Sequence, residues 1–323
     1  MKKVFIIAEA GINHNGKISL AKKLIFISKK AGADAVKFQL FDTDNFINKN
    51  HLPKVYKRMK SLEFTINEWK KIISYAKKMK IKIFFSIFDC KSLFLLKKLK
   101  INLIKIPSGE ITNYELLKKI SKTKKEIIIS TGMSSETDIL KALEILKFNK
   151  PSVLHCVSEY PSKLKNNNLN YLKTLSKINS IKEIGFSDHS KSKVLPSVAV
   201  TLGATIIEKH ITYNVNQKKG DHKMSLNFKD FREMIENIRN TQKALGLNKK
   251  IISQKELSLS KIARKGIYLK HNLKKKHKLK NSDFVLLRPI NSMNEITNLK
   301  YLDGKILNKD LEELTGIKKN DIT

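Results

Sequence analysis

Eight short apolar runs alternate with amphipathic stretches of helical length over the first 245 residues, and this alternation constrains the fold more than any other feature of the chain. The runs are rich in Val, Ile and Phe, which is typical of buried strands. They lie at residues 4–11, 34–39, 81–89, 102–110, 126–133, 152–158, 183–189 and 204–210. The helix candidates lie at residues 17–31, 66–80, 91–99, 113–123, 136–147, 168–178, 191–202 and 228–245.

Strands that alternate with helices in this way form parallel sheets, and eight such repeats predict a (β/α)₈ TIM barrel over residues 1–245. The alternative is an open, doubly wound α/β sheet, which a glycine-rich phosphate-binding loop after the first strand would favour. The stretch AEAGINHNG at residues 8–16 does not have that pattern. The barrel is therefore the favoured α/β architecture.

The sequence changes character after residue 245. Residues 246–258 are interpreted as a linker, and residues 259–323 alternate short apolar segments with basic turns, which predicts a small β-rich domain. A domain of about 65 residues buries little apolar surface, so we expect it to dock on another surface.

The net charge of +36, from 65 Lys and Arg against 29 Asp and Glu, raises the question of a nucleic-acid partner. The lysines alternate with apolar clusters at helical spacing, as in KKIISYAKKMK, which indicates solvated helix faces over a buried stripe. Arginine is sparse, and no basic motif is interleaved with aromatic residues. A basic nucleic-acid-binding protein remains the non-enzymatic alternative, and nucleic acid is not the expected partner.

Two further features bear on the compartment. The chain has no apolar run of roughly 18 residues, and its apolar N-terminal run breaks at Glu9, so we expect neither a membrane span nor a signal peptide. Its two cysteines, Cys90 and Cys156, are far apart, which argues against a disulfide framework. The expected location is the cytoplasm.

Polar residues close every one of the eight apolar runs. In TIM barrels the active site lies at the C-terminal ends of the strands, so these side chains should converge on one mouth. They are Glu9; Lys37 and Gln39; Ser86 and Asp89; Lys105, Ser108 and Glu110; Ser130 and Thr131; His155, Ser158, Glu159 and Tyr160; Ser187, Asp188 and His189; and Glu208 and His210.

These residue types suit an anionic substrate and a divalent cation. Lys37 and Lys105, with nearby serine hydroxyls, can hold a phosphate or a phosphate-carboxylate dianion. His189 and His210 end neighbouring strands and can share a metal, and Glu9 can act as an acid or a base. Carboxylate and imidazole ligands fit Mn²⁺, Co²⁺ or Zn²⁺, and Mg²⁺ less well.

The last run, ATIIEKHITYN at residues 204–214, places three ionisable side chains in succession. Because side chains alternate along a strand, Glu208 and His210 should share one face and Lys209 should point the other way. We expect His210 to be the metal ligand and Glu208 to be a buried polar partner within the mouth.

Several motifs resemble, in order and spacing, those of the sialic acid synthase family, which includes N-acetylneuraminate, legionaminate and pseudaminate synthases. They are IIAEAGINHNG, ADAVKFQ, IKIPSGEITN, IIISTGM, LHCVSEYP, IGFSDHS, AVTLGATIIEKHIT and GDHKMSL. The segments RKGIYLKHNLKKKHKL and VLLRP resemble the antifreeze-like (SAF) domain of that family. The third strand departs from the usual STPF ending: Ser86 keeps the hydroxyl, but Ile87 replaces the proline.

The resemblance implies a transferase that condenses phosphoenolpyruvate with an open-chain N-acyl mannosamine, giving a nine-carbon 2-keto sugar acid and phosphate. It implies a divalent metal, most often Mn²⁺ with Mg²⁺ or Co²⁺ possible, and a domain-swapped homodimer. By motif, His189 and His210 would be the metal ligands, Glu9 the catalytic acid or base, and Glu110 the carboxylate that orders a water on the metal. Phosphoenolpyruvate would contact Lys37, Ser86, Lys105, Ser108, Ser130 and Ser187, and the sugar would contact Gln39, Tyr160, Asp221 and, from the partner chain, Arg288.

The resemblance also bears on which sugar this chain would use as its substrate. N-acetylneuraminate synthase is the first interpretation and legionaminate synthase the alternative, because Glu159 and the stretch KFQ resemble the legionaminate enzymes. Pseudaminate synthases usually carry a different turn after the first strand.

Overall fold

The computed structural model describes residues 2–217, 220–290 and 298–323. The chain divides into two compact units, Met1–Gly246 and Leu247–Thr323. Within the described residues, no helix is long and apolar enough to cross a membrane.

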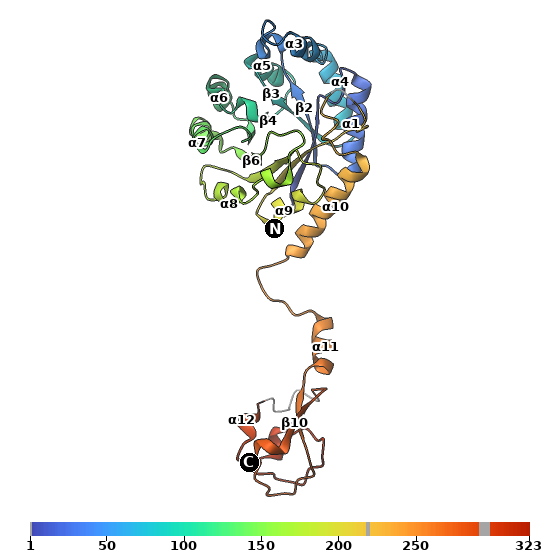
Figure 1. The fold of residues 1–323 in the computed structure, drawn as a ribbon, viewed down its shortest axis with the longest axis vertical. Helices are drawn as coiled ribbons and strands as arrows, with labels where there is room; N and C mark the ends of the chain where they lie inside the picture. Colours follow the sequence, from blue (N-terminus) through green and yellow to red (C-terminus); the bar gives the residue numbers. More distant parts are fainter. Residues whose placement is uncertain (1, 218–219, 291–297) are drawn as a thin grey trace. The chain divides into compact units, whose positions relative to one another are not determined.

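The first unit is a closed barrel of eight parallel strands, as the sequence predicts (Figure 1). Each strand pairs with the next along the chain, and β8 closes the ring on β1. The strands are β1 Phe5–Gly11, β2 Ala35–Leu40, β3 Lys82–Ile87, β4 Leu103–Ile106, β5 Glu126–Ser130, β6 Ser152–Cys156, β7 Ile184–Asp188 and β8 Ile206–His210.

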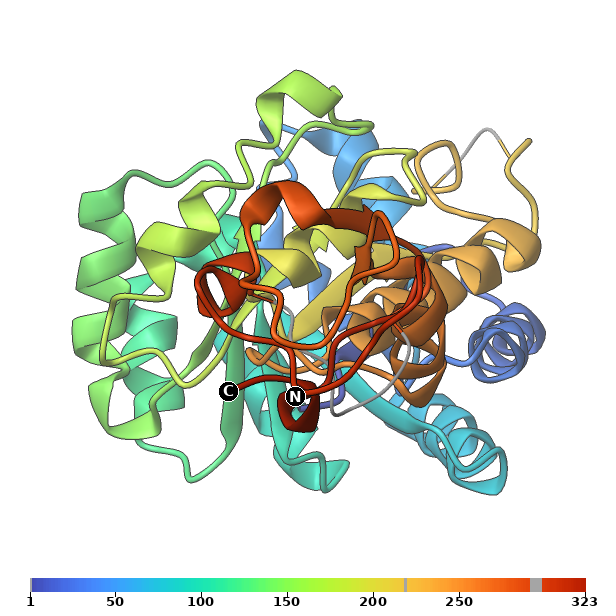
Figure 2. The same ribbon diagram turned by 90° about the horizontal axis from the view of Figure 1, so that it is seen from below.

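Helices surround this barrel in both perpendicular views (Figures 1 and 2). They are α1 Ile18–Ala31, α2 Thr43–Phe46, α3 Pro53–Lys60, α4 Ile66–Lys78, α5 Cys90–Lys98, α6 Tyr114–Ser121, α7 Glu136–Ile145, α8 Tyr171–Leu175, α9 Leu195–Thr201 and α10 Phe228–Leu245. Short 3₁₀ turns are η1 Ser108–Glu110, η2 Lys147–Asn149 and η3 Leu164–Asn166. The short helices α2 and α3, between β2 and α4, were not predicted.

Helix α4 shows why lysine-rich segments fold against the barrel. Its buried face carries Trp69, Ile72, Ile73 and Ala76, and its lysines lie on the opposite side. Thr65 begins the helix with a capping box, in which its hydroxyl accepts from a backbone N–H of the first turn. The lysines are therefore the solvated face of an amphipathic helix, as expected.

Some predicted strand ends are turns instead. The run predicted at residues 102–110 ends as a strand at Ile106, and Ser108–Glu110 form η1. Pro107 interrupts the ladder because it has no N–H to donate. The helix predicted at residues 168–178 is likewise shorter, since α8 covers Tyr171–Leu175.

Strand register places the polar strand ends on one level. Glu9 lies opposite Lys37 on one side and His210 on the other, Ser86 lies opposite Lys105, and Ser187 opposite Glu208. Because successive residues of a barrel strand face alternately inward and outward, these residues all point to the barrel axis.

The second unit contains α11 Gln254–Ala263, β9 Gly266–Leu269, η4 Asn281–Asp283, β10 Phe284–Leu287, α12 Leu299–Leu302 and η5 Lys319–Asp321. Strands β9 and β10 form an antiparallel pair, and isolated bridges extend the β structure. Its core is small, and consists of Ile267, Leu269, Leu279, Phe284, Leu302, Leu307, Leu311, Ile317 and Ile322.

Helix α11 begins at Gln254, inside the predicted linker at residues 246–258, and continues past residue 258. Ser253 and Glu256 form a capping box at its start. That S-x-x-E spacing is a helix-start signal that is visible in the sequence.

Candidate active site

Eleven of the fourteen residues predicted for the site line one cavity of about 70 Å³ at the C-terminal ends of the strands. The cavity is small because long charged side chains fill the mouth and contact one another. The eleven are Glu9, Lys37, Gln39, Ser86, Lys105, Ser108, Ser130, Tyr160, Ser187, His189 and His210, and Phe88, Pro107, Cys156 and Glu208 complete the lining.

Two buried lysines dominate the cavity. The Nζ of Lys37 lies 3.1 Å from Glu9 Oε2 and 3.3 Å from Glu208 Oε1 and donates to Ser86 Oγ at 2.8 Å. The Nζ of Lys105 lies 3.3 Å from Glu208 Oε1 and donates to Ser130 Oγ at 2.5 Å. Each lysine thus has a hydroxyl neighbour from the adjacent strand, and both share one carboxylate.

Glu208 is the centre of this network. Ser187 Oγ also donates to its Oε1, at 3.0 Å. Burial alone would raise the pKa of Glu208, but the ammonium groups of Lys105 and Lys37 lower that pKa to about 2. Glu208 is therefore ionised, and it is the partner of both lysines.

The pKa of Glu9 is shifted in the opposite direction from that of Glu208. Burial raises the pKa of Glu9 to about 7, and Lys37 offsets only part of the desolvation cost. A carboxyl group with that pKa exchanges its proton near neutral pH, as a general acid or base requires.

The two lysines also differ. Burial lowers the pKa of both side chains, yet the net shift for Lys37 is upward, because two carboxylates lie beside it. For Lys105, which contacts a single carboxylate, that of Glu208, the net shift is downward.

The imidazoles of His189 and His210 lie side by side, with ring centroids 5.5 Å apart. His189 Nδ1 is 2.7 Å from the carbonyl oxygen of Val157, so Nδ1 carries the proton and Nε2 has the free lone pair. His210 Nδ1 is buried and has no hydrogen-bond partner among the described residues. Burial keeps the pKa of His210 well below its usual value, so the ring is neutral.

This pair fits a divalent metal through two imidazole nitrogens, with oxygen ligands from elsewhere. No group of three or more His, Cys, Asp or Glu side chains that could hold a metal occurs in the part of the chain that the structure describes. A metal here would therefore rely on water or substrate for its remaining ligands.

The outward faces of β7 and β8 carry a second buried ion pair. Lys209 Nζ donates to Asp188 Oδ2 and to the carbonyl oxygen of Ser190, both at 2.5 Å. Asp188 Oδ1 accepts from the N–H of Ser190. Lys209 thus points away from Glu208 and His210, as the strand alternation predicts, and fastens the segment that carries His189.

Three predicted residues do not line the cavity. Glu110 lies in η1 and accepts a hydrogen bond from Asn113, and burial raises its pKa. Asp221 lies close by, with Oδ2 at 3.7 Å from His210 Nδ1. Arg288 follows β10 in the second unit and is exposed, and its predicted role remains a prediction.

Sequence reasoning missed Asn13, which is fully buried in the loop after β1. Its amide nitrogen donates to the carbonyl oxygen of Ile211 and to Ser225 Oγ, and its oxygen accepts from the N–H of Asp221. Asn13 thus ties the β1 and β8 loops together beside the mouth. The polar cluster INHN gave a signal, but the partners of Asn13 lie 198 to 212 residues away in the sequence, a separation that no local pattern reveals.

Comparison with known proteins identifies the family. Residues 24–250 match the NeuB family. The chain is 38% identical to an N,N'-diacetyllegionaminic acid synthase of Campylobacter jejuni, over 97% of this chain and 98% of the relative. It is 33% identical to a pseudaminic acid synthase of the same species, over 99% of this chain and 97% of the relative.

A solved structure agrees. The N-acetylneuraminic acid synthetase of Leptospira borgpetersenii, in complex with citrate, has a TM-score of 0.73 and 32% identity, covering 80% of this chain and 90% of that one. The chain belongs to the NeuB family. The predicted family and class are thereby confirmed: it is an enzyme, a phosphoenolpyruvate-dependent synthase that forms a carbon–carbon bond.

Proposed function

We propose that this enzyme condenses phosphoenolpyruvate with an open-chain N-acyl hexosamine, to give a nine-carbon 2-keto sugar acid and inorganic phosphate. The observation that carries the proposal is the cavity with two buried lysines, each beside a serine hydroxyl, next to a pair of imidazoles. Such a cavity suits a small dianion held against a polarised carbonyl group.

Lys37 and Lys105 would bind the phosphate and carboxylate of phosphoenolpyruvate, with Ser86, Ser108, Ser130 and Ser187 donating hydrogen bonds. In the structure the lysines contact Glu9 and Glu208. The substrate anions would replace part of those contacts, so the lysines are already ordered and desolvated when the substrate arrives. Positioning of this kind supplies several kcal/mol of the barrier reduction, because the enol carbon is held over the carbon it attacks.

Glu9 would donate a proton to the aldehyde oxygen as the new bond forms. Its buried carboxyl keeps the proton up to about pH 7, which makes it an acid at neutral pH. Attack of water on C2, with its proton passing to the Glu9 carboxylate, would give a hemiketal phosphate. Its C–O bond to phosphate then breaks, the hydroxyl becomes the 2-keto group, and the hydroxyl proton leaves with phosphate. We assign Glu110 to ordering the water near the metal.

His189 and His210 would hold a divalent metal, for which Mn²⁺ is the first choice by ligand type. When bound, such an ion polarises a carbonyl oxygen and stabilises negative charge on it. The hydrogen bond from His189 Nδ1 to Val157 and the Lys209–Asp188 pair would orient the first imidazole.

For the sugar, Gln39, Tyr160 and Asp221 would contact the acceptor from the barrel. Tyr160 packs on His189, with ring centroids 4.4 Å apart. We propose a 2,4-diacetamido-6-deoxy hexose as the acceptor ahead of N-acetylmannosamine, because identity to the legionaminic acid synthase is 38%, against 32% to the neuraminic acid synthetase.

A domain-swapped homodimer is proposed as the assembly, in which Arg288 completes the site of the partner. Helix α11 supports this proposal, because none of its residues is buried and Leu259 and Ile262 are more than 60% exposed. Apolar side chains so exposed are typical of surfaces that bind another chain.

The decisive experiment incubates the purified enzyme with phosphoenolpyruvate, Mn²⁺ and either sugar, and measures phosphate and 2-keto acid together. We expect equal amounts of both products and a higher kcat/KM for the 2,4-diacetamido sugar. Higher kcat/KM for N-acetylmannosamine would reverse the choice of sugar. Absence of phosphate release with any N-acyl hexosamine would reject the proposed function.

A further inference from the structure

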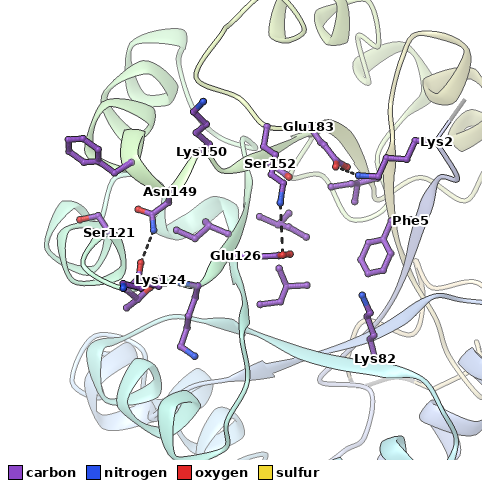
Figure 3. Close-up of a pocket in the computed structure, with 18 of the residues that line it drawn as sticks. Lys2, Phe5, Lys82, Ser121, Lys124, Glu126, Asn149, Lys150, Ser152 and Glu183 are labelled. Atoms are coloured by element: carbon purple, nitrogen blue, oxygen red, sulfur yellow. Dashed lines mark hydrogen bonds and ion pairs between the residues drawn. The ribbon is translucent and has the colours of Figure 1, made fainter.

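A second cavity, of about 740 Å³, opens at the other end of the barrel, where the strands begin (Figure 3). Its wall includes the first residues of several strands, among them Phe5, Lys82, Glu126, Ser152 and Ile206. On β3, Lys82 and the active-site Ser86 are four residues apart, which is about 13 Å along a strand. The two cavities are therefore separate, and none of the residues of the catalytic mouth lines the second one.

The second cavity is strongly basic. Eight of its twenty lining residues are lysines and two are glutamates, whereas Lys and Arg together make up 65 of 323 residues in the chain. The lysines are Lys2, Lys3, Lys82, Lys122, Lys124, Lys125, Lys150 and Lys182. The basic lining is therefore denser than the composition of the chain accounts for.

Both glutamates have cationic neighbours. Glu183 pairs with Lys2, and Glu126 lies 4.0 Å from Lys182. For Lys122, Lys124 and Lys150 no ion pair occurs among residues 2–217, 220–290 and 298–323. These three ammonium groups are thus available for an anion, and Figure 3 shows Lys124 and Lys150 on the same side of the cavity, with Asn149 between them.

An aromatic surface lies beside these lysines. Phe148 lines the cavity and is 87% exposed, which is unusual for a phenylalanine. Its neighbour Asn149 donates to the carbonyl oxygen of Thr123, and its Oδ1 has no hydrogen-bond partner among the described residues. A flat, hydrogen-bonding group could stack on Phe148 and, after a small rotation of the amide, donate to Asn149.

We propose that this cavity is a ligand site for a nucleoside diphosphate. Two phosphate groups match the lysines Lys122, Lys124 and Lys150, and the base matches the exposed ring of Phe148. The volume falls within the roughly 300–1,000 Å³ of small-molecule sites. A ligand here would leave the catalytic mouth accessible, so it would bind together with phosphoenolpyruvate.

Isothermal titration calorimetry of the full-length enzyme tests this proposal, with ADP and CDP as probes at about 0.15 M salt, where long-range attraction is screened. We expect one of the two to bind, with unchanged affinity when phosphoenolpyruvate is saturating. The double variant Lys124→Glu/Lys150→Glu should bind it at least about tenfold more weakly. Phe148→Ala should weaken the binding of the nucleotide and leave the binding of inorganic pyrophosphate unchanged.

The matched control is Lys173→Glu/Lys177→Glu, which makes the same charge change at exposed lysines of the α8 region. Equal weakening in the control would show that the overall charge of +36 attracts the probe, and would overturn the proposal. So would displacement of the probe by phosphoenolpyruvate, equal binding of pyrophosphate and nucleotide, or no binding of either nucleotide.

Discussion

The inner and outer faces of strands β7 and β8 both carry buried charges, yet the two faces differ in how completely those charges are satisfied. On the outer face, Lys209 and Asp188 bond to each other and to the backbone of Ser190. On the inner face, Glu208 bonds to Ser187 and two lysines, but its Oε2 has no hydrogen-bond partner among the described residues. His210 Nδ1, on the same face, also has no hydrogen-bond partner among the described residues.

The difference shows that burial alone does not identify a functional charge. A closed pair such as Lys209–Asp188 has no capacity left for a ligand, so its contribution is to the structure. An incompletely satisfied cluster is costly unless something else binds it. Mutations in the inner cluster should therefore mainly lower the activity, and mutations in the outer pair should mainly lower the stability of the fold.

The largest expected effect is the loss of an inner imidazole. His189→Ala or His210→Ala should lower turnover about 10⁴-fold, because several kcal/mol of charge stabilisation disappear with the metal. Mn²⁺ titration should show lost binding, with an unchanged circular dichroism spectrum. His155→Ala is the control: His155 is equally buried but bonds to the carbonyl oxygen of Asn167, so that variant should keep Mn²⁺ binding. Near-normal turnover in either first variant would refute the ligand assignment.

Breaking the outer pair should act on stability. Lys209→Met leaves the Asp188 carboxylate buried without its cation and should lower the free energy of unfolding by about 3–5 kcal/mol. Urea denaturation measures this change. The double variant Lys209→Met/Asp188→Asn removes the unpaired charge and should recover most of the loss. If the single variant unfolds like the wild type, the outer pair is not structural.

Lys105→Met makes the same chemical change on the inner face. Glu208 keeps Lys37 as a partner, so the unfolding free energy should change far less than in Lys209→Met. The kcat/KM for phosphoenolpyruvate should fall about 10²–10³-fold, as when a positioned donor is removed. If Lys105→Met and Lys209→Met lower the free energy of unfolding by the same amount, the proposed difference between the two faces is wrong.

The pH profile sharpens the comparison within the inner face. Because burial raises the pKa of Glu9 to about 7, its protonated fraction falls as pH rises through 7, and kcat should fall over the same range, about tenfold per unit at its steepest. The stability that Glu9 contributes is likewise present below its unfolded pKa of 4.5 and lost as pH rises through 7. In the Glu9→Gln variant, the residual kcat should no longer fall as pH rises through 7. If the wild-type kcat instead rises with pH over this range, Glu9 acts as a base.

The smallest expected effect comes from outside the barrel. Arg288→Ala should raise the KM for the sugar about tenfold, because one charge-assisted hydrogen bond is lost. The KM for phosphoenolpyruvate should change little. Steady-state kinetics with each substrate varied in turn measures both. An unchanged sugar KM would show that the second unit does not complete the site.

The sequence predicted the barrel well because its signal is local and repeated. Apolar runs and helical stripes each depend on neighbouring residues, and eight repeats leave few alternatives. The convergence of Lys37, Lys105, His189 and His210 then followed from one rule, that polar strand ends meet at the C-terminal mouth.

What could not be predicted depends on contacts between distant segments. The sequence did not reveal that Glu208 would bridge both lysines, because the three side chains come from three separate strands, β2, β4 and β8. Asn13 holds a loop 198 to 212 residues away in the sequence, and the basic cavity is assembled from the starts of several strands. Helix α11 is a different case, since its capping box was present in the sequence.

The outer pair also has a consequence for how the barrel closes. Strand β8 is the last barrel strand along the chain, and it pairs with both β7 and β1. A slip of one residue would turn Glu208 and His210 toward the hydrophobic helix layer and Lys209 toward the axis. In that misaligned state Asp188 would face no cation, and three ionisable groups would be buried without partners. The Lys209–Asp188 pair, buried on the outer face, therefore makes a one-residue slip of the last strand less stable than the native register.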